Sequence, residues 1–333
     1  KKSVALNLKE KAGRDALLRL VASADVFVQN FRPGVIERMG LGEEQLRKVA
    51  PDLVMVSISG FGDTGPYSQR PVYDPLIQGL SGLATVQAGA DELRPQLVRT
   101  ILPDKLTGVT AAQAITAALF ARERTGESQH VRLSMLDAII AFLWSSDMGS
   151  QTFVHSEVPQ QEAASLQDLI YETTTGYITI AVQSDREWQA LIRAVDRPEW
   201  AEDPRFLTAR LRQENIDARL ELIQSVIKTD TAEHWLATLE AEQVPCAPVL
   251  TRTQVLDHPQ VEANSLLSNY DHPQAGRLRQ AREPPRFSAT PEQQWQGAPR
   301  LGEQTTELLA ECGYSSEEIQ ALCDSGIAAI PAE

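Results

Sequence analysis

Asp104 is the carboxylate whose sequence surroundings best suit covalent chemistry. It follows the apolar segment TILP (residues 100–103) and precedes a helical pattern that begins at Lys105. An aspartate at the amino end of a helix commonly caps that helix. A carboxylate held there by helix amides in an apolar setting could instead act as a nucleophile. From the residues alone, both interpretations of Asp104 remain open.

Two further acidic residues stand early in helical patterns. Asp74 follows Tyr73 and heads one helix, and Asp137 lies one turn into another. Capping explains Asp74 as well as chemistry does, and capping or a solvated helix face explains Asp137. These two positions by themselves identify no reaction.

Histidine-centred and metal-centred chemistry have little support in this sequence. Its five histidines are scattered, at positions 130, 155, 234, 258 and 272. The sequence contains no serine-hydrolase motif, Walker loop, zinc pattern or glycine-rich dinucleotide fingerprint. We therefore expect no metal site, and we interpret the histidines as surface or capping residues.

The turn at residues 30–34, Asn-Phe-Arg-Pro-Gly, carries an aromatic residue that a turn does not need. Phe31 is either a plug for the core or a surface on which a flat ring stacks. In the second case, Arg32 and Arg38 could reach phosphate groups. A second turn, at residues 59–67, contains three glycines that would let a ligand approach the backbone closely.

The elements around these turns predict how they are positioned. Strands are expected at the N-terminus, at residues 25–28 and at residues 53–59, with helices at 12–23 and 43–49 between them. Such an alternation predicts a parallel sheet with crossover helices. Ligands bind at the carboxyl ends of the strands in such sheets, and both turns would lie there.

The rest of the chain indicates further domains. Helices at 74–84, 105–125 and 136–146 and a strand at 130–135 complete the first part, and residues 150–168 are polar and irregular. We predict an α/β protein whose large, Rossmann-like domain has a parallel sheet and whose smaller domain is α+β. The expected boundaries are 1–150 for the large domain, 165–260 for the small domain, and 270–333 for a return segment with helices that pack on the large domain.

Composition restricts the classes of partner. The 333 residues carry a formal net charge of −14, which disfavours nucleic acid but not a small anion held by local cations and amides. No apolar stretch is long enough to cross a bilayer, so no membrane partner is expected. Three widely spaced cysteines make a reducing cytoplasm the expected location.

Nine segments, taken in order along nearly the whole chain, resemble the class III CoA-transferase family. This family is of the CaiB/BaiF type and includes formyl-CoA and carnitine CoA-transferase-like enzymes. The segments are KKSVALNLK, ADVFVQNFRPGVIERMGL, PDLVMVSISGFGDTGPY, VYDPLIQGLSGL with the helix at Asp104, RTGESQHVRLSMLDA, GYITIAVQSDREW, AVDRPEWAEDPRF, VPCAPVLT and APRLGEQT.

The resemblance implies a fold, an assembly and a mechanism. Subunits of two domains, the larger one Rossmann-like, would interlock as a homodimer. Coenzyme A would pass from an acyl-CoA to a free carboxylic acid as a substrate, with no tightly bound cofactor. The nucleophilic aspartate of the family corresponds to Asp104, and Asp74 matches an acidic position on the substrate side. The CoA contacts correspond to Leu6, Lys9, Asn30, Phe31, Arg32, Arg38, Met39, Arg70 and Tyr73.

Two alternatives to CoA transfer remain. The 2-methylacyl-CoA racemases resemble this sequence too, but they have a histidine before the aspartate where this chain has Tyr73. They also have a glutamate in the region of residues 181–184, where this chain reads AVQS. A racemase needs two groups that exchange protons on opposite faces of the substrate, so transfer is favoured. The other alternative is a homologue that binds CoA without catalysis.

The sequence also departs from the family pattern. Residues 150–176 lack the glycine run of formyl-CoA transferases, so oxalate or formate is not expected as a substrate. Ser128 stands where the family usually has glycine. The family places roughly 60–70 residues of strand–helix–strand before the segment that opens this chain, and they form part of the CoA pocket. Without them a sheet would expose apolar edges, so we expect residues 1–333 by themselves to be poorly soluble or inactive.

Overall fold

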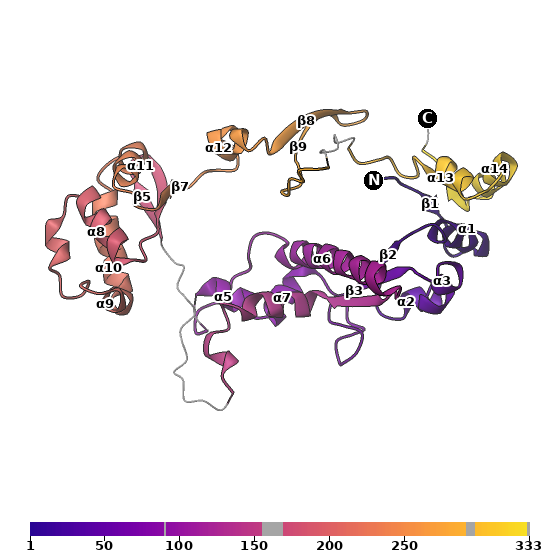
Figure 1. Cartoon of the computed structure of the whole chain (residues 1–333), viewed down its shortest axis with the longest axis horizontal. Helices are drawn as coiled ribbons and strands as arrows, with labels where there is room; N and C mark the ends of the chain where they lie inside the picture. Colours follow the sequence, from indigo (N-terminus) through magenta and orange to yellow (C-terminus); the bar gives the residue numbers. More distant parts are fainter. Residues whose placement is uncertain (90, 155–168, 291–296, 332–333) are drawn as a thin grey trace. The chain divides into compact units, whose positions relative to one another are not determined.

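The computed structural model describes residues 1–89, 91–154, 169–290 and 297–331. The chain divides into two compact units (Figure 1). Unit 1 comprises Lys1–Ala164 with Ala298–Glu333, and unit 2 comprises Ser165–Gly297. The predicted α/β fold with a parallel sheet is confirmed. Residues 270–297, which we expected in the return segment, belong to unit 2.

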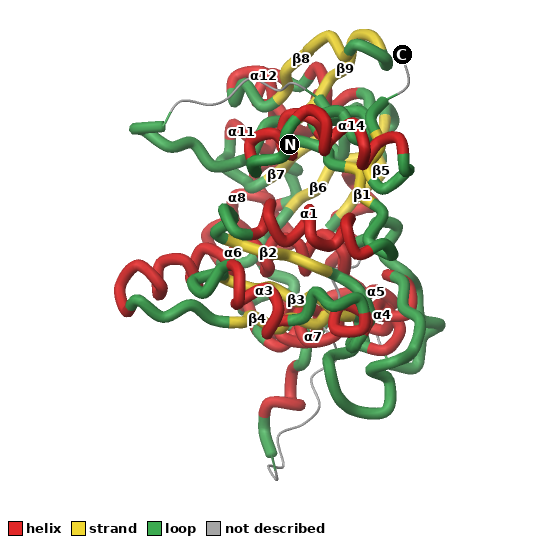
Figure 2. Tube along the Cα trace, turned by 90° about the vertical axis from the view of Figure 1, so that its right-hand side faces the viewer, coloured by secondary structure: helices red, strands yellow, loops and turns green. Residues whose placement is uncertain are grey.

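The sheet of unit 1 has three parallel strands in the order β2-β3-β4 (Figure 2). They are β2 (Val26–Gln29), β3 (Val54–Ser59) and β4 (His130–Ser134). Valine and isoleucine are frequent in β3, because β-branched side chains pack well on a pleated surface. In register, Gln29 pairs with Ser57, and Ser57 pairs with Arg132. The carboxyl ends of all three strands therefore lie at one edge.

Helices cover both faces of this sheet. The long helix α6 (Leu102–Thr125) packs on one face, where it meets Val56. Helices α1 (Lys11–Val21) and α3 (Glu43–Val49) cover the other face, where they meet Met55. Successive residues of a strand point to opposite faces, so neighbouring residues of β3 belong to two different cores.

The N-terminal strand does not join the parallel sheet, and our prediction for it was wrong. Strand β1 (Ala5–Leu6) pairs antiparallel with β10 (Ala328–Ala329). Helices α13 (Thr305–Glu311) and α14 (Ser316–Asp324) pack with α1 around this pair (Figure 1). The core that they share consists of Ala16, Leu309, Ile319, Leu322 and Ala328. A two-residue strand has little pairing energy of its own, so this local apolar core decides its partner.

A fourth core in unit 1 lies under the helices that carry the acidic residues. It joins α4 (Asp74–Leu80), α5 (Leu83–Ala88) and α7 (Met135–Trp144) to the start of α6. The single helix that we expected at 74–84 is divided at Gly82, whose φ of 85° interrupts the helix. The backbone N–H of Leu136 donates to the carbonyl of Gly60 at 3.1 Å and ties α7 to the end of β3.

Unit 2 contains an antiparallel sheet with helices and an aromatic core. Its sheet has the order β5-β6-β7, with β5 (Ile170–Thr173), β6 (Gly176–Ile180) and β7 (Cys246–Pro248). Trp188 stacks on Trp200 and meets the edge of Phe206 in the core. The helices of this core are α8 (Asp185–Ala194), α10 (Ile216–Ile227) and α11 (Ala232–Ala241).

The remaining elements are short. Unit 1 also contains α2 (Val35–Arg38) and the 3-10 turn η1 (Gly149–Thr152). Unit 2 also contains η2 (Pro198–Ala201), α9 (Ala209–Glu214), η3 (Gln254–Asp257), α12 (Pro259–Ala263), β8 (Leu267–His272) and β9 (Gly276–Ala281). In the described part of the chain, no helix has both the length and the apolar character needed to cross a bilayer.

Candidate active site

Two aspartates from different helices meet in unit 1. Asp74 is the first residue of α4, and its side chain is buried. Asp104 lies in the first turn of α6, and its backbone N–H donates to Oδ2 of Asp74 at 3.3 Å. Helix α6 begins at Leu102, with Ile101 at the capping position, so Asp104 is not the N-cap. The structure therefore leaves the Asp104 carboxylate free of the capping role that the sequence allowed.

Gln78 fixes this arrangement, and sequence reasoning missed it. Its side chain is 2% exposed, and its Nε2 donates to Oδ1 of Asp74 at 2.6 Å. The same amide nitrogen reaches the carbonyls of Val98 and Thr100, and its Oε1 accepts the N–H of Val98 at 2.9 Å. One buried amide thus joins Asp74 to the loop that leads into Asp104. The available signal was spacing, since Gln78 lies four residues after Asp74 on the same helix face.

The electrostatics of the pair leave Asp104 poorly stabilised as an anion. Apolar neighbours partly desolvate the Asp104 carboxyl, which raises its pKa above the ordinary value, and the charge of Asp74 raises it further. Among the described residues, neither carboxylate has a lysine, arginine or histidine as an ion-pair partner. Asp104 itself is exposed, so a substrate can reach its carboxylate. A partly desolvated carboxylate without an ion-pair partner is suited to attack an electrophilic carbonyl.

The turn after β2 is exposed rather than packed. Phe31 is 43% exposed, so it is not a plug for the core. Gly34 has φ 81° and begins α2, a conformation that a residue with a side chain rarely adopts. A Cβ on Gly34 would also lie 2.9 Å from Nη1 of Arg38, which shows how closely that guanidinium covers the turn. Asn30 and Arg32 are exposed beside Phe31.

The turn after β3 lies next to the first one. Gln69 donates from Nε2 to the carbonyl of Pro33 at 3.4 Å, which links the two turns. The guanidinium of Arg70 stacks over the ring of Tyr67 at 3.6 Å. Arg70 and Tyr67 line a mostly apolar hollow of about 360 Å³ on the outer side of α4. Tyr73, directly before Asp74, is 78% exposed.

Other predicted CoA contacts lie elsewhere in unit 1. Leu6 belongs to β1 and packs against the core shared by α13 and α14. Lys9 is exposed in the loop after β1, and its backbone N–H donates to Asn7. Met39 ends α2 and is half-buried. Among the described residues, no hydrogen bond or ion pair joins Leu6 or Lys9 to the turn at residues 30–34.

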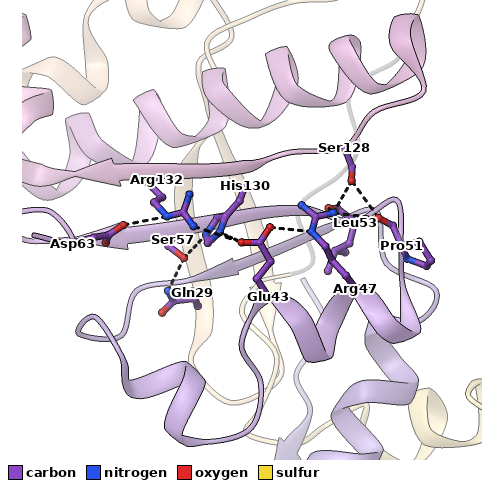
Figure 3. A network of polar contacts seen from close by, with 10 residues as sticks. All are labelled: Gln29, Glu43, Arg47, Pro51, Leu53, Ser57, Asp63, Ser128, His130 and Arg132. Atoms are coloured by element: carbon purple, nitrogen blue, oxygen red, sulfur yellow. Dashed lines mark hydrogen bonds and ion pairs between the residues drawn. The ribbon is translucent and has the colours of Figure 1, made fainter.

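A polar network crosses the α3 face of the sheet (Figure 3). The sequence did not predict it, because we interpreted His130 as a surface or capping residue. Nδ1 of His130 lies 2.8 Å from Oε2 of Glu43, and its Nε2 lies 2.8 Å from Oγ of Ser57. Partial burial alone would raise the pKa of Glu43, but hydrogen bonds from His130 and Arg47 outweigh it and hold the pKa below the ordinary value. The available signal was alternation, which places His130 and Arg132 on one face of β4.

No metal centre is indicated. Within the described ranges, no group of three or more histidine, cysteine, aspartate or glutamate side chains could hold a metal ion. The Asp74–Asp104 pair is the closest association of two carboxylates described above.

Comparisons with known proteins identify the family of the chain. Residues 1–305 match the family described as CoA-transferase family III. An acetyl-CoA:oxalate CoA-transferase of Acetobacter aceti is 32% identical over 318 residues, which cover 93% of this chain and 79% of that protein. Human succinyl-CoA:glutarate CoA-transferase is 28% identical over 98% of this chain and 75% of its own length.

A solved structure of the same family is also similar to this chain. The crystal structure of a CAIB/BAIF family protein from Brucella suis has a TM-score of 0.78 and 30% identity, over 92% of this chain and 80% of that chain. The family and the activities of these relatives favour CoA transfer over the racemase alternative. The chain therefore belongs to CoA-transferase family III and is an enzyme of the CoA-transferase class.

Proposed function

We propose that this enzyme moves coenzyme A from an acyl-CoA to a free carboxylic acid through covalent intermediates on Asp104. The observation that carries the proposal is the Asp74–Asp104 pair. The Asp104 carboxylate has no capping role and, within the described ranges, no counter-ion, and its pKa is raised by desolvation and by Asp74. A buried neighbour, Asp74, holds the backbone of Asp104 by accepting its N–H.

The proposed reaction has four steps on one carboxylate. Asp104 attacks the thioester carbonyl, the C–S bond breaks, and an acyl-aspartyl anhydride and CoA thiolate form. The thiolate attacks Cγ of Asp104, which releases the donor acid and leaves an aspartyl-CoA thioester. The acceptor carboxylate attacks that thioester, which gives a new anhydride and frees the thiolate again. The thiolate then takes the acceptor acyl group, and the Asp104 carboxylate is restored.

We assign roles in this reaction to the residues around Asp104 and to the turn at residues 30–34 from where they lie. Asp74 and Gln78 orient the start of α6, which carries Asp104, and the loop before it. We assign them to the substrate side. The turn at residues 30–34 offers an exposed aromatic ring, and Arg32 and Arg38 offer cations for the phosphates of CoA.

The full set of proposed CoA contacts combines these residues with those that the family resemblance implies. The hollow beside Arg70 supports an apolar portion of the substrate near that set. The set is Leu6, Lys9, Asn30, Phe31, Arg32, Arg38, Met39, Arg70 and Tyr73.

The identity of the acids is open to direct test. The relatives are named for acetyl-CoA with oxalate and for succinyl-CoA with glutarate. A panel that crosses acetyl-CoA and succinyl-CoA with oxalate and glutarate would assign donor and acceptor. It would also test our prediction from residues 150–176 that oxalate is a poor substrate.

Assembly and location complete the proposal. We propose a homodimer, supported by apolar side chains that unit 1 leaves exposed on α6, including Val109 at 68% and Phe120 at 65%. A cytoplasmic location is supported by three cysteines that form no disulfide. Neither nucleic acid nor a membrane is a proposed partner. Sedimentation of the purified enzyme tests the dimer.

The covalent intermediate is tested by trapping. Hydroxylamine, added during turnover of an acyl-CoA, should convert the aspartyl intermediate to a hydroxamate. Mass spectrometry should then locate the added mass on the peptide that contains Asp104. Full turnover without any modification of that peptide would refute the mechanism.

A further inference from the structure

A chain of hydrogen bonds runs across the sheet with one donor direction. The carboxylate of Glu43 can only accept, so Nδ1 of His130 donates to it over 2.8 Å. In the neutral ring Nε2 is then the acceptor, and the hydroxyl of Ser57 donates to it over 2.8 Å. Oγ of Ser57 accepts from Nε2 of Gln29 at 2.8 Å. Figure 3 shows these links.

The chain ends at the backbone of the turn proposed to hold CoA. The amide of Gln29 gives its nitrogen to Ser57, so its Oε1 faces the turn and accepts the N–H of Phe31 at 2.7 Å. Each member comes from a different element, namely α3, β4, β3 and β2. Glu43, at the other end of this series of hydrogen bonds, is held in place because Arg47 donates to it at 2.9 Å. The orientation of one side-chain amide is thus set from the opposite edge of the sheet.

The space below the turn at residues 30–34 makes these hydrogen bonds important for the conformation of that turn. A hollow of about 170 Å³ lies there, with Phe31, Pro33 and Ile36 on the side of the turn. Ser57 and His130 line the side of the sheet. Because side chains do not fill this space, directed hydrogen bonds such as the one from the N–H of Phe31 help to hold the conformation of the turn.

We propose that Glu43, His130, Ser57 and Gln29 are positioning residues that hold the turn at Phe31 in the conformation that binds CoA. This inference rests on the proposed CoA site at that turn. The four residues touch neither the reacting carboxylate nor, in this proposal, the thioester. They act on the affinity for CoA through the backbone of Phe31.

A nucleophilic role for Ser57 is the competing interpretation. Ser57, His130 and Glu43 have the order of a serine–histidine–carboxylate triad. However, Ser57 lies inside the central strand, which is paired on both sides, and Gln29 already donates to its oxygen. An acyl-transfer nucleophile needs free N–H donors for an oxyanion, and a paired central strand offers few of them.

The test separates affinity from turnover. Replacing Ser57→Ala should raise the KM for acyl-CoA about two- to tenfold, the effect of one net hydrogen bond, and leave kcat within about twofold. The matched control is Ser128→Ala, which removes the hydroxyl that accepts from Arg47 on the other branch of the network. The control should leave the KM unchanged although it also removes a hydroxyl bonded within that network.

Gln29 offers a rescue experiment. Gln29→Leu removes the acceptor for the N–H of Phe31 and should raise the KM as much as Ser57→Ala or more. Gln29→Glu keeps an acceptor oxygen at that position and should recover at least part of the affinity. A merely structural role would lower the midpoint of thermal unfolding in both variants without this difference in KM.

The outcomes distinguish the inference from the function on which it rests. Equal KM values for Ser57→Ala, Ser128→Ala and the unmodified enzyme would overturn the positioning role. So would a loss of kcat in Ser57→Ala together with labelling of Ser57 by a fluorophosphonate, which would assign a nucleophile. If Phe31→Ala leaves the KM unchanged, the proposed CoA site itself is wrong, whatever the Ser57 variant does.

Discussion

The Asp74–Asp104 pair and the Glu43 network are two carboxylate sites in unit 1 with opposite electrostatics. Asp104 lies beside another carboxylate and has no ion-pair partner in the described part of the chain, and its pKa is raised. Glu43 is surrounded by His130, Arg47 and Arg132, and its pKa is lowered. At the first site the charged form of the carboxylate is disfavoured, which fits the nucleophilic role that we propose for Asp104. At the second site the charge of Glu43 joins α3 to β4.

The largest expected effect is on the first site. Asp104→Ala should lower kcat by more than about 10³-fold, because the proposed mechanism loses its only nucleophile. Steady-state transfer assays measure this loss. Asp137→Ala is the matched control, since Asp137 is also acidic and in the first turn of a helix, and it should retain activity. A normal kcat in Asp104→Ala would contradict the proposed nucleophile and with it the functional difference between the two sites.

A smaller change in activity is expected from Asp74→Asn. An asparagine can offer only one oxygen where Asp74 accepts from both Gln78 and Asp104, so kcat should fall roughly tenfold. Losing the negative charge also lowers the pKa of Asp104. The acidic limb of the kcat profile should therefore move to lower pH. A shift toward higher pH would contradict the assigned coupling.

The contribution of the Glu43 network to the stability of the folded protein should depend on pH. The pKa of Glu43 is lower in the folded chain than the ordinary value of 4.5, so its stabilisation is present above pH 4.5 and is lost as the pH falls through the folded value. Glu43→Gln should thus lower the midpoint of thermal unfolding at neutral pH, by about 1–3 °C for a half-exposed ion pair. Calorimetry from neutral to acidic pH should show this difference disappear in acid.

The smallest expected effect is on stability at the Asp74–Asp104 pair, where removing the charge of Asp104 should stabilise the fold at neutral pH. A raised pKa means that protonated Asp104 favours folding below the ordinary value of 3.8, and that this contribution is lost as the pH rises through the folded value. At neutral pH the Asp104 carboxylate therefore opposes folding. Asp104→Asn should raise the unfolding midpoint slightly at neutral pH, with no gain in acid. A lower midpoint at neutral pH would show that the two sites do not differ in the way described.

Much of the local structure was predictable because it depends on short-range patterns. Helix α3, for example, has the bounds that its sequence pattern predicts, residues 43–49. The two turns follow strands whose β-branched residues define their ends. Strand β1 was placed wrongly, because a two-residue strand has no pattern that names its partner.

The sequence by itself determined the family and the α/β class, since motif order and periodicity are properties of neighbouring residues. Only the tertiary structure brought Asp104 to Asp74, 30 residues away, and His130 to Glu43, 87 residues away. It also showed that Gln78 joins Asp74 to the loop before α6, and that Ser57 joins Gln29 to His130. Such pairings depend on the packing of helices and strands far apart in the chain, and that packing decides which carboxylate is left without a cation.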